Sequence, residues 1–146
     1  MKYDLNSITE DGKIAFTATN SKDIGHLGNH QTIVFDRVVT NIGNQYHQHS
    51  GIFTTTVSGV YVFFFDLRAR QNAQLYGALV KDGTVLVVAY AYAPNVSHYH
   101  RSDSNMAVTH LNEGDSVWVQ TVDVYQQTIL LLDDGSSFSG FLLYRD

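Results

Sequence analysis

The sequence predicts an all-β protein built from one domain. Most of the chain consists of short apolar runs separated by turn-forming residues, and no segment has a convincing helical period. The pair Asp82-Gly83 is a strong hairpin signal between two such runs. A chain of 146 residues has the length of a single domain, and its hydrophobic fraction of 44% is enough for a packed core.

The expected strands are justified by the turn chemistry that separates them. Ser58-Gly59 joins two of them tightly, residues 81–84 form the Asp-Gly hairpin, and residues 112–115 form another short turn. The polar residues 1–12 precede a globular domain expected at 13–146. The strands are expected at residues 14–19, 32–39, 51–57, 60–70, 75–80, 85–92, 106–111, 116–122 and 138–144.

A set of eight positions within residues 35–65 carries a family resemblance. Residues 111–119, with Gly114 and Trp118, and the closing run 137–144 agree with it. The pattern resembles the signature of the complement C1q globular-head family, within the tumour-necrosis-factor-like jelly rolls. Invertebrate-type C1q-domain proteins and sialic-acid-binding lectins share this resemblance. The eight positions are Phe35, Asn41, Tyr46, Phe53, Gly59, Tyr61, Phe63 and Phe65.

The resemblance implies a jelly-roll sandwich of about ten strands that assembles as a homotrimer. It also implies a secreted, non-enzymatic protein that binds ligands through its surface. Residues 1–12 lack the apolar core of a signal peptide, so a mature form is expected. The sequence has no collagen-like Gly-X-Y repeat, and a free-standing head of this kind resembles invertebrate defence proteins.

Side-chain parity along residues 60–70 identifies the expected trimer interface. Tyr61, Phe63 and Phe65 fall on one apolar face, which we expect in the core. Val60, Val62 and Phe64 fall on the other face, where a sandwich strand normally meets water. A covering loop is the alternative explanation, but the resemblance favours a subunit interface. We also place His110, within an expected strand, in this interface or in the core.

Alternation of loops in an antiparallel sheet predicts where ligands bind. The short turns at residues 58–59, 81–84 and 112–115 fall at one end of the sandwich. The opposite end receives the longer connections, where binding residues concentrate on rigid scaffolds. These are residues 44–50, 71–74, 94–105 and 123–137.

The residue types in the long connections favour an acidic glycan. Arginine grips a carboxylate through two parallel hydrogen bonds, tyrosine rings pack on sugar C–H faces, and glutamine matches hydroxyls. Sialylated or microbial glycans are the expected class of partner. The candidate ligand-binding residues are Arg68, Arg70, Tyr99, His100, Arg101, Tyr125 and Gln126.

Two other patterns concern metals. His47 with His49, and His98 with His100, form His-x-His pairs that would face one way on an extended segment and suit a transition metal. Exposed loop histidines are the alternative explanation, and the metal is left unassigned. No cofactor is expected, although calcium is an alternative at Asp123 and the Asp133-Asp134-Gly135 turn.

Composition and missing motifs exclude several classes of function. The net charge of −5 and the lack of basic runs argue against nucleic acid, and no apolar run is long enough to span a bilayer. The sequence has no cysteine and none of the common catalytic motifs, so no enzyme is expected.

The sequence and its resemblance to the C1q family together predict a secreted, trimeric, multivalent glycan-binding protein that acts in pattern recognition. A cytokine-like or adhesion module that binds proteins is the first alternative, and a matrix or biomineral protein is the second.

Overall fold

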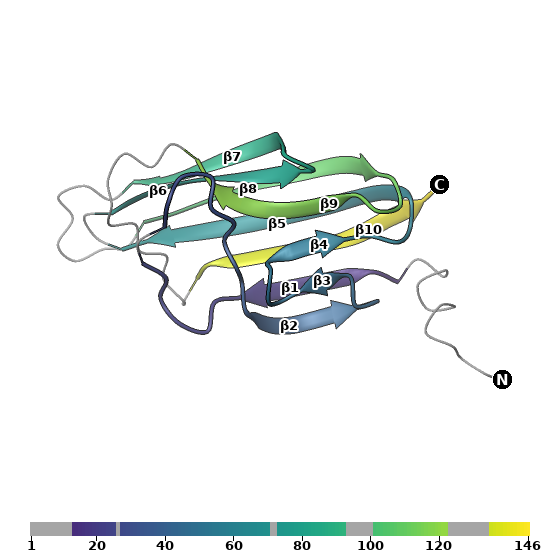
Figure 1. Cartoon of the computed structure of the whole chain (residues 1–146), viewed down its shortest axis with the longest axis horizontal. Helices are drawn as coiled ribbons and strands as arrows, with labels where there is room; N and C mark the ends of the chain where they lie inside the picture. The colour runs from purple at the N-terminus through teal and green to yellow at the C-terminus, as the bar shows by residue number, and fades with distance from the viewer. Residues whose placement is uncertain (1–12, 26, 71–72, 93–100, 123–134) are drawn as a thin grey trace.

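Two five-stranded antiparallel sheets face each other in the computed structural model, which describes residues 13–25, 27–70, 73–92, 101–122 and 135–146 (Figure 1). The strands of the first sheet have the order β2-β1-β10-β5-β8, and those of the second have the order β3-β4-β9-β6-β7. The described residues contain no helix, so the all-β prediction is confirmed. The strands are β1 (Ala15–Thr19), β2 (Arg37–Ile42), β3 (Tyr46–His47), β4 (Ile52–Thr54), β5 (Gly59–Ala69), β6 (Gln74–Lys81), β7 (Thr84–Tyr92), β8 (Arg101–Leu111), β9 (Ser116–Thr121) and β10 (Ser137–Arg145).

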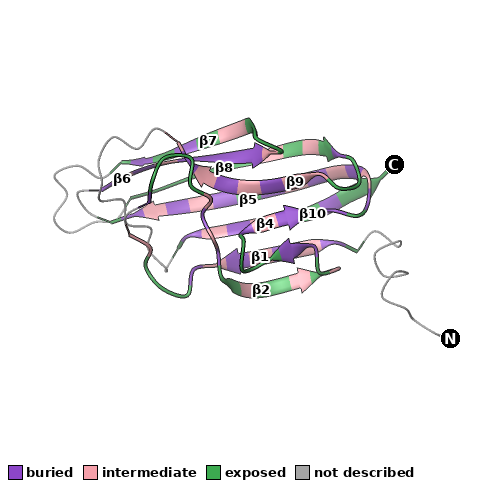
Figure 2. Ribbon diagram, in the orientation of Figure 1, coloured by how far each residue is buried: buried purple, intermediate pink, exposed green. Residues whose placement is uncertain are grey.

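The central strand β5 confirms the predicted parity. Its inward side chains, including Tyr61, Phe63 and Phe65, are fully buried between the two sheets. Val60 and Val62 point outward and are half-buried, and Phe64 beside them is exposed. Figure 2 shows this alternation as bands of buried and partly exposed residues along the strand.

Aromatic rings fill the centre of the core. The ring of Phe16 lies 4.8 Å from that of Tyr46, 5.2 Å from Phe53 and 4.9 Å from Phe138, measured between centroids. The buried Tyr46 hydroxyl donates a hydrogen bond of 2.6 Å to the Phe35 carbonyl, and burial raises the pKa of this phenol. The packing of these rings joins β1, β3, β4 and β10 in one cluster.

Several strands differ from the sequence prediction. The strand expected at 32–39 is shifted, since β2 covers Arg37–Ile42 and Thr32 forms only an isolated bridge with Gln120. The short strand β3 lies in a segment expected to be a loop. Strand β8 begins at Arg101 rather than at Met106. Residues 101–105 are polar on both faces, so no alternation marked them, but pairing with β5 makes them a strand.

The predicted short-turn end is confirmed, whereas most of three predicted long connections, at residues 71–72, 94–100 and 123–134, lies outside the described residues. The backbones of Thr55, Gly114 and Asp115 are hydrogen-bonded, and these residues lie at the end that holds the short turns. We call this the short-turn end and the opposite end the long-loop end. Residues 44–50 do not lie at the long-loop end as a unit, because the Gln45 carbonyl accepts from Thr54 N–H and its side-chain oxygen accepts from Thr56 N–H.

Side chains of β8 close one side of the sandwich against the free edge of β7. An Asp103 carboxylate oxygen accepts a hydrogen bond of 2.8 Å from Tyr90 N–H, and the Asn105 amide donates one of 2.8 Å to the Val88 carbonyl. An open strand edge exposes such groups to pairing with another chain. In this protein the side chains of Asp103 and Asn105, at the start of β8, form hydrogen bonds with these backbone groups of β7.

A hydrogen-bonded pair ties the two ends of the connection between β1 and β2. The Asp36 carboxylate accepts from the Ser21 hydroxyl at 2.6 Å and from Ser21 N–H at 2.8 Å. Both hydrogen bonds lower the pKa of Asp36 below its usual range, and the bond from the Ser21 hydroxyl has the larger effect.

Replacing Ser21 with Ala is expected to reduce stability at neutral pH by about 1 kcal/mol or less, because both groups are exposed. The folded-state pKa of Asp36 is the lower one, so this contribution is present above the unfolded-state pKa. It disappears as the pH falls through the folded-state value. Urea unfolding of both proteins at neutral and strongly acidic pH measures the difference.

The exposed Ser102 provides the matched control, since Ser102→Ala removes a hydroxyl from β8 without touching Asp36. A Ser21→Ala effect of equal size at both pH values would contradict the assignment to the ionised carboxylate.

Candidate functional site

The outer surface of the first sheet carries a continuous apolar patch, which we call the apolar face. Val62 lies between Val108 on β8 and Phe141 on β10, and Phe64 lies beside Met106. Met106 and Val108 are more than half exposed in the single chain. Large apolar patches on a soluble protein mark interaction surfaces. The apolar face consists of Val60, Val62, Phe64, Met106, Val108, Phe141 and Tyr144.

The same sheet surface becomes polar toward the long-loop end. Asp66 lies opposite Ser104, and Arg68 lies opposite Ser102. Burial raises the pKa of Asp66, and the nearby Asp103 adds to the increase while Arg68 opposes it. The surface is therefore apolar over one half and polar over the other, as the parity along residues 60–70 predicted.

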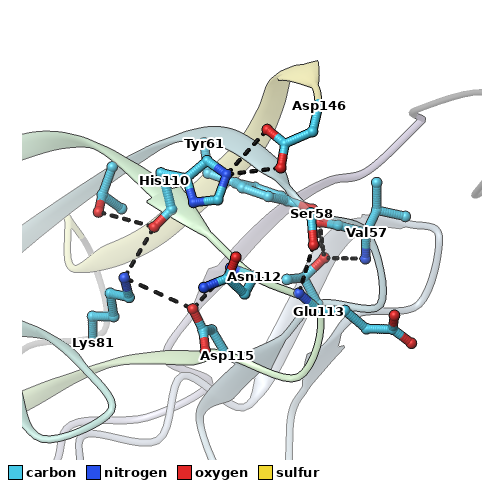
Figure 3. A network of polar contacts seen from close by, with 11 residues as sticks. Val57, Ser58, Tyr61, Lys81, His110, Asn112, Glu113, Asp115 and Asp146 are labelled. Carbon is cyan, nitrogen blue, oxygen red and sulfur yellow. Dashed lines mark hydrogen bonds and ion pairs between the residues drawn. The ribbon is translucent and has the colours of Figure 1, made fainter.

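A polar network borders the apolar face at the short-turn end (Figure 3). His110, which pairs with Val60, places Nε2 at 3.0 and 2.9 Å from the two carboxylate oxygens of Asp146. Lys81 Nζ donates a hydrogen bond to the His110 carbonyl at 3.0 Å and lies 3.7 Å from an Asp115 carboxylate oxygen. His110 thus lies at the margin of the apolar face, on the outside of the sheet and not in the core.

Three arginines lie near the long-loop end of β5 and β8, but not on one face of the sheet, because Arg101 pairs with the inward-facing Ala69 while Arg68 pairs with Ser102 on the outer surface. Arg101 begins β8 opposite Ala69, the last residue of β5, and Arg70 follows directly. Arg68 packs against Gly135, where a β-carbon would lie 2.9 Å from the arginine Cδ. Arg70 and Arg101 are exposed to solvent. Arg101 is therefore a strand residue at a sheet corner rather than a loop residue.

Several predicted site residues lie outside the described part of the chain. These include the calcium candidates, and within the described ranges no three His, Cys, Asp or Glu side chains form a metal-binding group. His47 lies on β3 while His49 lies in the following turn, so this pair does not share an extended segment. The residues outside the described ranges are Tyr99, His100, Tyr125, Gln126, His98, Asp123, Asp133 and Asp134.

Sequence reasoning missed two features. A cavity beside β2 and β3 has His47 and His49 in its lining, together with amide side chains. On the outer surface of the second sheet, the ring of Tyr90 lies 5.4 Å from that of Tyr76 and is stacked 5.5 Å from that of Tyr92. The alternation of Tyr90 and Tyr92 along the strand was visible in the sequence, but their pairing with Tyr76 depends on strand register.

The fold and the apolar face define a class, the jelly rolls of the tumour-necrosis-factor type. The structure superposes on the globular domain of zebrafish complement 1qA with a TM-score of 0.75 at 24% identity, over 92% of this chain and 100% of the other. It superposes on Eiger TNF from S. frugiperda with a TM-score of 0.72 at 13% identity, over 92% and 95% of the two chains. These similarities show the fold alone.

Sequence comparison places the chain within that class. The C1q domain model matches residues 15–143. The chain is 37% identical to Caprin-2 from Danio rerio over 142 residues, and 35% identical to a subunit of the complement C1q subcomponent from Homo sapiens over 136 residues. Each match covers 92% of this chain, but only 14% and 51% of the respective relative. The chain belongs to the C1q domain family.

Membership confirms the coarser part of the functional prediction. C1q and tumour-necrosis-factor-like domains are non-enzymatic recognition modules that self-associate as trimers and bind partners. Among the described residues, no helix is long and apolar enough to cross a membrane.

Proposed function

We propose that this chain forms a secreted homotrimer that binds glycans through several equivalent sites. The observation that carries the proposal is the division of one sheet surface into an apolar half and a polar half with arginines at its end. The first half supports self-association, and the second supports recognition of a ligand.

The apolar face supports self-association because it has no described cover. Phe64, Phe141 and Met106 are between 41% and 55% exposed in the single chain. Burial of such surface stabilises an assembly by about 25 cal/mol per Å² of apolar area. A cyclic trimer would bring the apolar faces of three copies together around its axis, with the polar half nearer the long-loop end.

The arginines at the long-loop end support an acidic glycan as ligand. Arg101 pairs with Ala69, so the backbones of Arg70 and Arg101 are close together at the corner between β5 and β8, and both residues are exposed. With a net charge of −5, the chain provides no general attraction for anions, so selection depends on these local cations. Three copies in one trimer raise avidity without new contacts.

The stacked tyrosines favour a second candidate, a protein-binding module of the cytokine or adhesion type. Tyr90 and Tyr92 are 43% and 51% exposed on the outer surface of the second sheet. Tyrosine is enriched at protein interfaces. A glycan array distinguishes the two candidates. A glycan-binding protein is expected to bind some sugars on the array more strongly than others, whereas a protein-binding module is expected to show no such preference.

Replacing Arg101 with Gln is expected to remove much of the preference for sialylated over desialylated glycoproteins. Charge-assisted hydrogen bonds to a carboxylate contribute about 1.5–3 kcal/mol, so the affinity for the sialylated form falls about tenfold or more. Surface plasmon resonance with paired sialylated and desialylated glycoproteins measures the ratio.

Arg145→Gln is the matched control, because Arg145 is an exposed arginine paired with Gly59 at the short-turn end. It is expected to leave the ratio unchanged. Equal binding of the unmodified protein to both glycoproteins would overturn the acidic-glycan proposal and favour the protein-binding module.

A further inference from the structure

A cavity of about 350 Å³ lies on the side of the sandwich where β2 and β3 form the sheet edges. In Figure 1 this side lies opposite the β7 and β8 edges. The residues that line the cavity include none of the arginines discussed above. Small-molecule sites in proteins have volumes of about 300–1,000 Å³. The lining residues are Val38, Asn41, Asn44, Tyr46, His47, Gln48 and His49.

Two of the lining side chains, those of Asn41 and Tyr46, make hydrogen bonds that hold the wall in place. The Asn41 side-chain amide donates to the Tyr46 carbonyl at 2.9 Å, and its oxygen accepts from Tyr46 N–H at 3.3 Å. The Tyr46 hydroxyl is bonded to the Phe35 carbonyl. Asn41 therefore bridges β2 to β3 with the hydrogen bonds of a strand pair, and the base of the cavity is rigid.

The turn that carries the other wall is also constrained. The His47 carbonyl accepts from Ser50 N–H at 3.3 Å and from Gly51 N–H at 2.9 Å. Gly51 has φ of 77°, and a β-carbon there would lie 2.6 Å from the Ile33 carbonyl oxygen. Only glycine fits this close approach at a positive φ. These contacts constrain the backbone of the turn that carries residues 47–50.

Four other lining side chains are exposed and make no hydrogen bond to any described residue: those of Asn44, His47, Gln48 and His49. Each carries a donor and an acceptor when the imidazole is neutral. None of the described residues that line the cavity is a carboxylate, lysine or arginine. Rigid walls with uncommitted neutral donors and acceptors are suited to a ligand rich in hydroxyl groups, and Val38 adds an apolar wall for its C–H groups.

We propose that this cavity binds one uncharged sugar unit. The site lies apart from the arginines at the long-loop end, so this proposal goes beyond the proposed function. The cavity would bind a neutral sugar, whereas the long-loop end would bind an acidic one. The carboxamides of Asn44 and Gln48 bond vicinal hydroxyls, and the imidazoles of His47 and His49 bond others.

The test is a titration of the full ¹⁵N-labelled chain with glucose, galactose and N-acetylglucosamine, in the presence of EDTA. Amide chemical shifts are expected to change for residues 38–49 with a dissociation constant on the order of 1–10 mM for at least one sugar. The combined change Asn44→Gly and Gln48→Ala is expected to weaken that binding about tenfold or more. Glycine is chosen because Asn44 has φ of 55°, which glycine adopts without strain.

Asn112→Ala is the control, since Asn112 is an exposed asparagine in a short turn away from the cavity. It is expected to bind sugar like the unmodified chain. The proposal is overturned if no sugar changes the amide chemical shifts of residues 38–49. It is also overturned if Zn²⁺, added without EDTA, changes these chemical shifts while no sugar does. Shifts confined to the arginine end would also overturn it, while leaving the proposed function intact.

Discussion

Replacing Val62 with Asp is expected to convert the trimer into monomers. Val62 lies at the centre of the apolar face, between Val108 and Phe141. In the assembly this position would be shielded from water, and an unpaired buried carboxylate costs several kcal/mol. Sedimentation equilibrium is expected to give about three times the chain mass of 16.3 kDa for the unmodified protein and one times that mass for the variant.

Val85→Asp is the matched control for this experiment. Val85 is 47% exposed, but it lies on β7 in the second sheet, outside the apolar face. The same chemical change there is expected to leave the trimer intact. A stable monomer of the unmodified chain at micromolar concentration would refute the assembly outright, and a trimeric Val62→Asp protein would show that another surface forms the interface.

Replacing Phe63 with Ala is expected to cost about 3–5 kcal/mol of unfolding free energy, a large share of a domain's total stability of about 5–15 kcal/mol. The Phe63 side chain is fully buried, with its ring 5.3 Å from Phe53 and 6.2 Å from Phe138. A β-carbon at Gly140 would lie 2.5 Å from the Phe63 ring and 2.8 Å from the Phe16 ring, so glycine at this position leaves room for both rings. Urea unfolding, followed by near-UV circular dichroism, measures the loss.

The adjacent Phe64 tests whether burial rather than residue type sets this cost. It is 41% exposed on the opposite surface of β5, so Phe64→Ala is expected to cost far less. Both changes are best compared in the Val62→Asp protein, where assembly does not contribute. Similar losses for the two phenylalanines would contradict the assignment of the two faces of β5.

The sequence alone determined the class of fold and the two faces of its central strand. The period of two along residues 60–70 assigns Phe63 inward and Val62 outward whatever the neighbouring strands are. The turn residues around Asp82-Gly83 likewise determine a hairpin locally, and Asp82 and Gly83 both have positive φ. Such features are predictable because they depend on residues close together in the chain.

Only the tertiary structure decided the features that depend on distant partners. Arg101 begins a strand because β5 lies beside it, although residues 101–105 carry no alternating pattern. The cavity exists because Asn41 bridges to Tyr46 while Gly51 packs against Ile33. The apolar face needs the register of β5, β8 and β10 to bring Val62, Val108 and Phe141 together. Periodicity within a segment assigns a side chain to a face, but pairing between segments determines which side chains share a site.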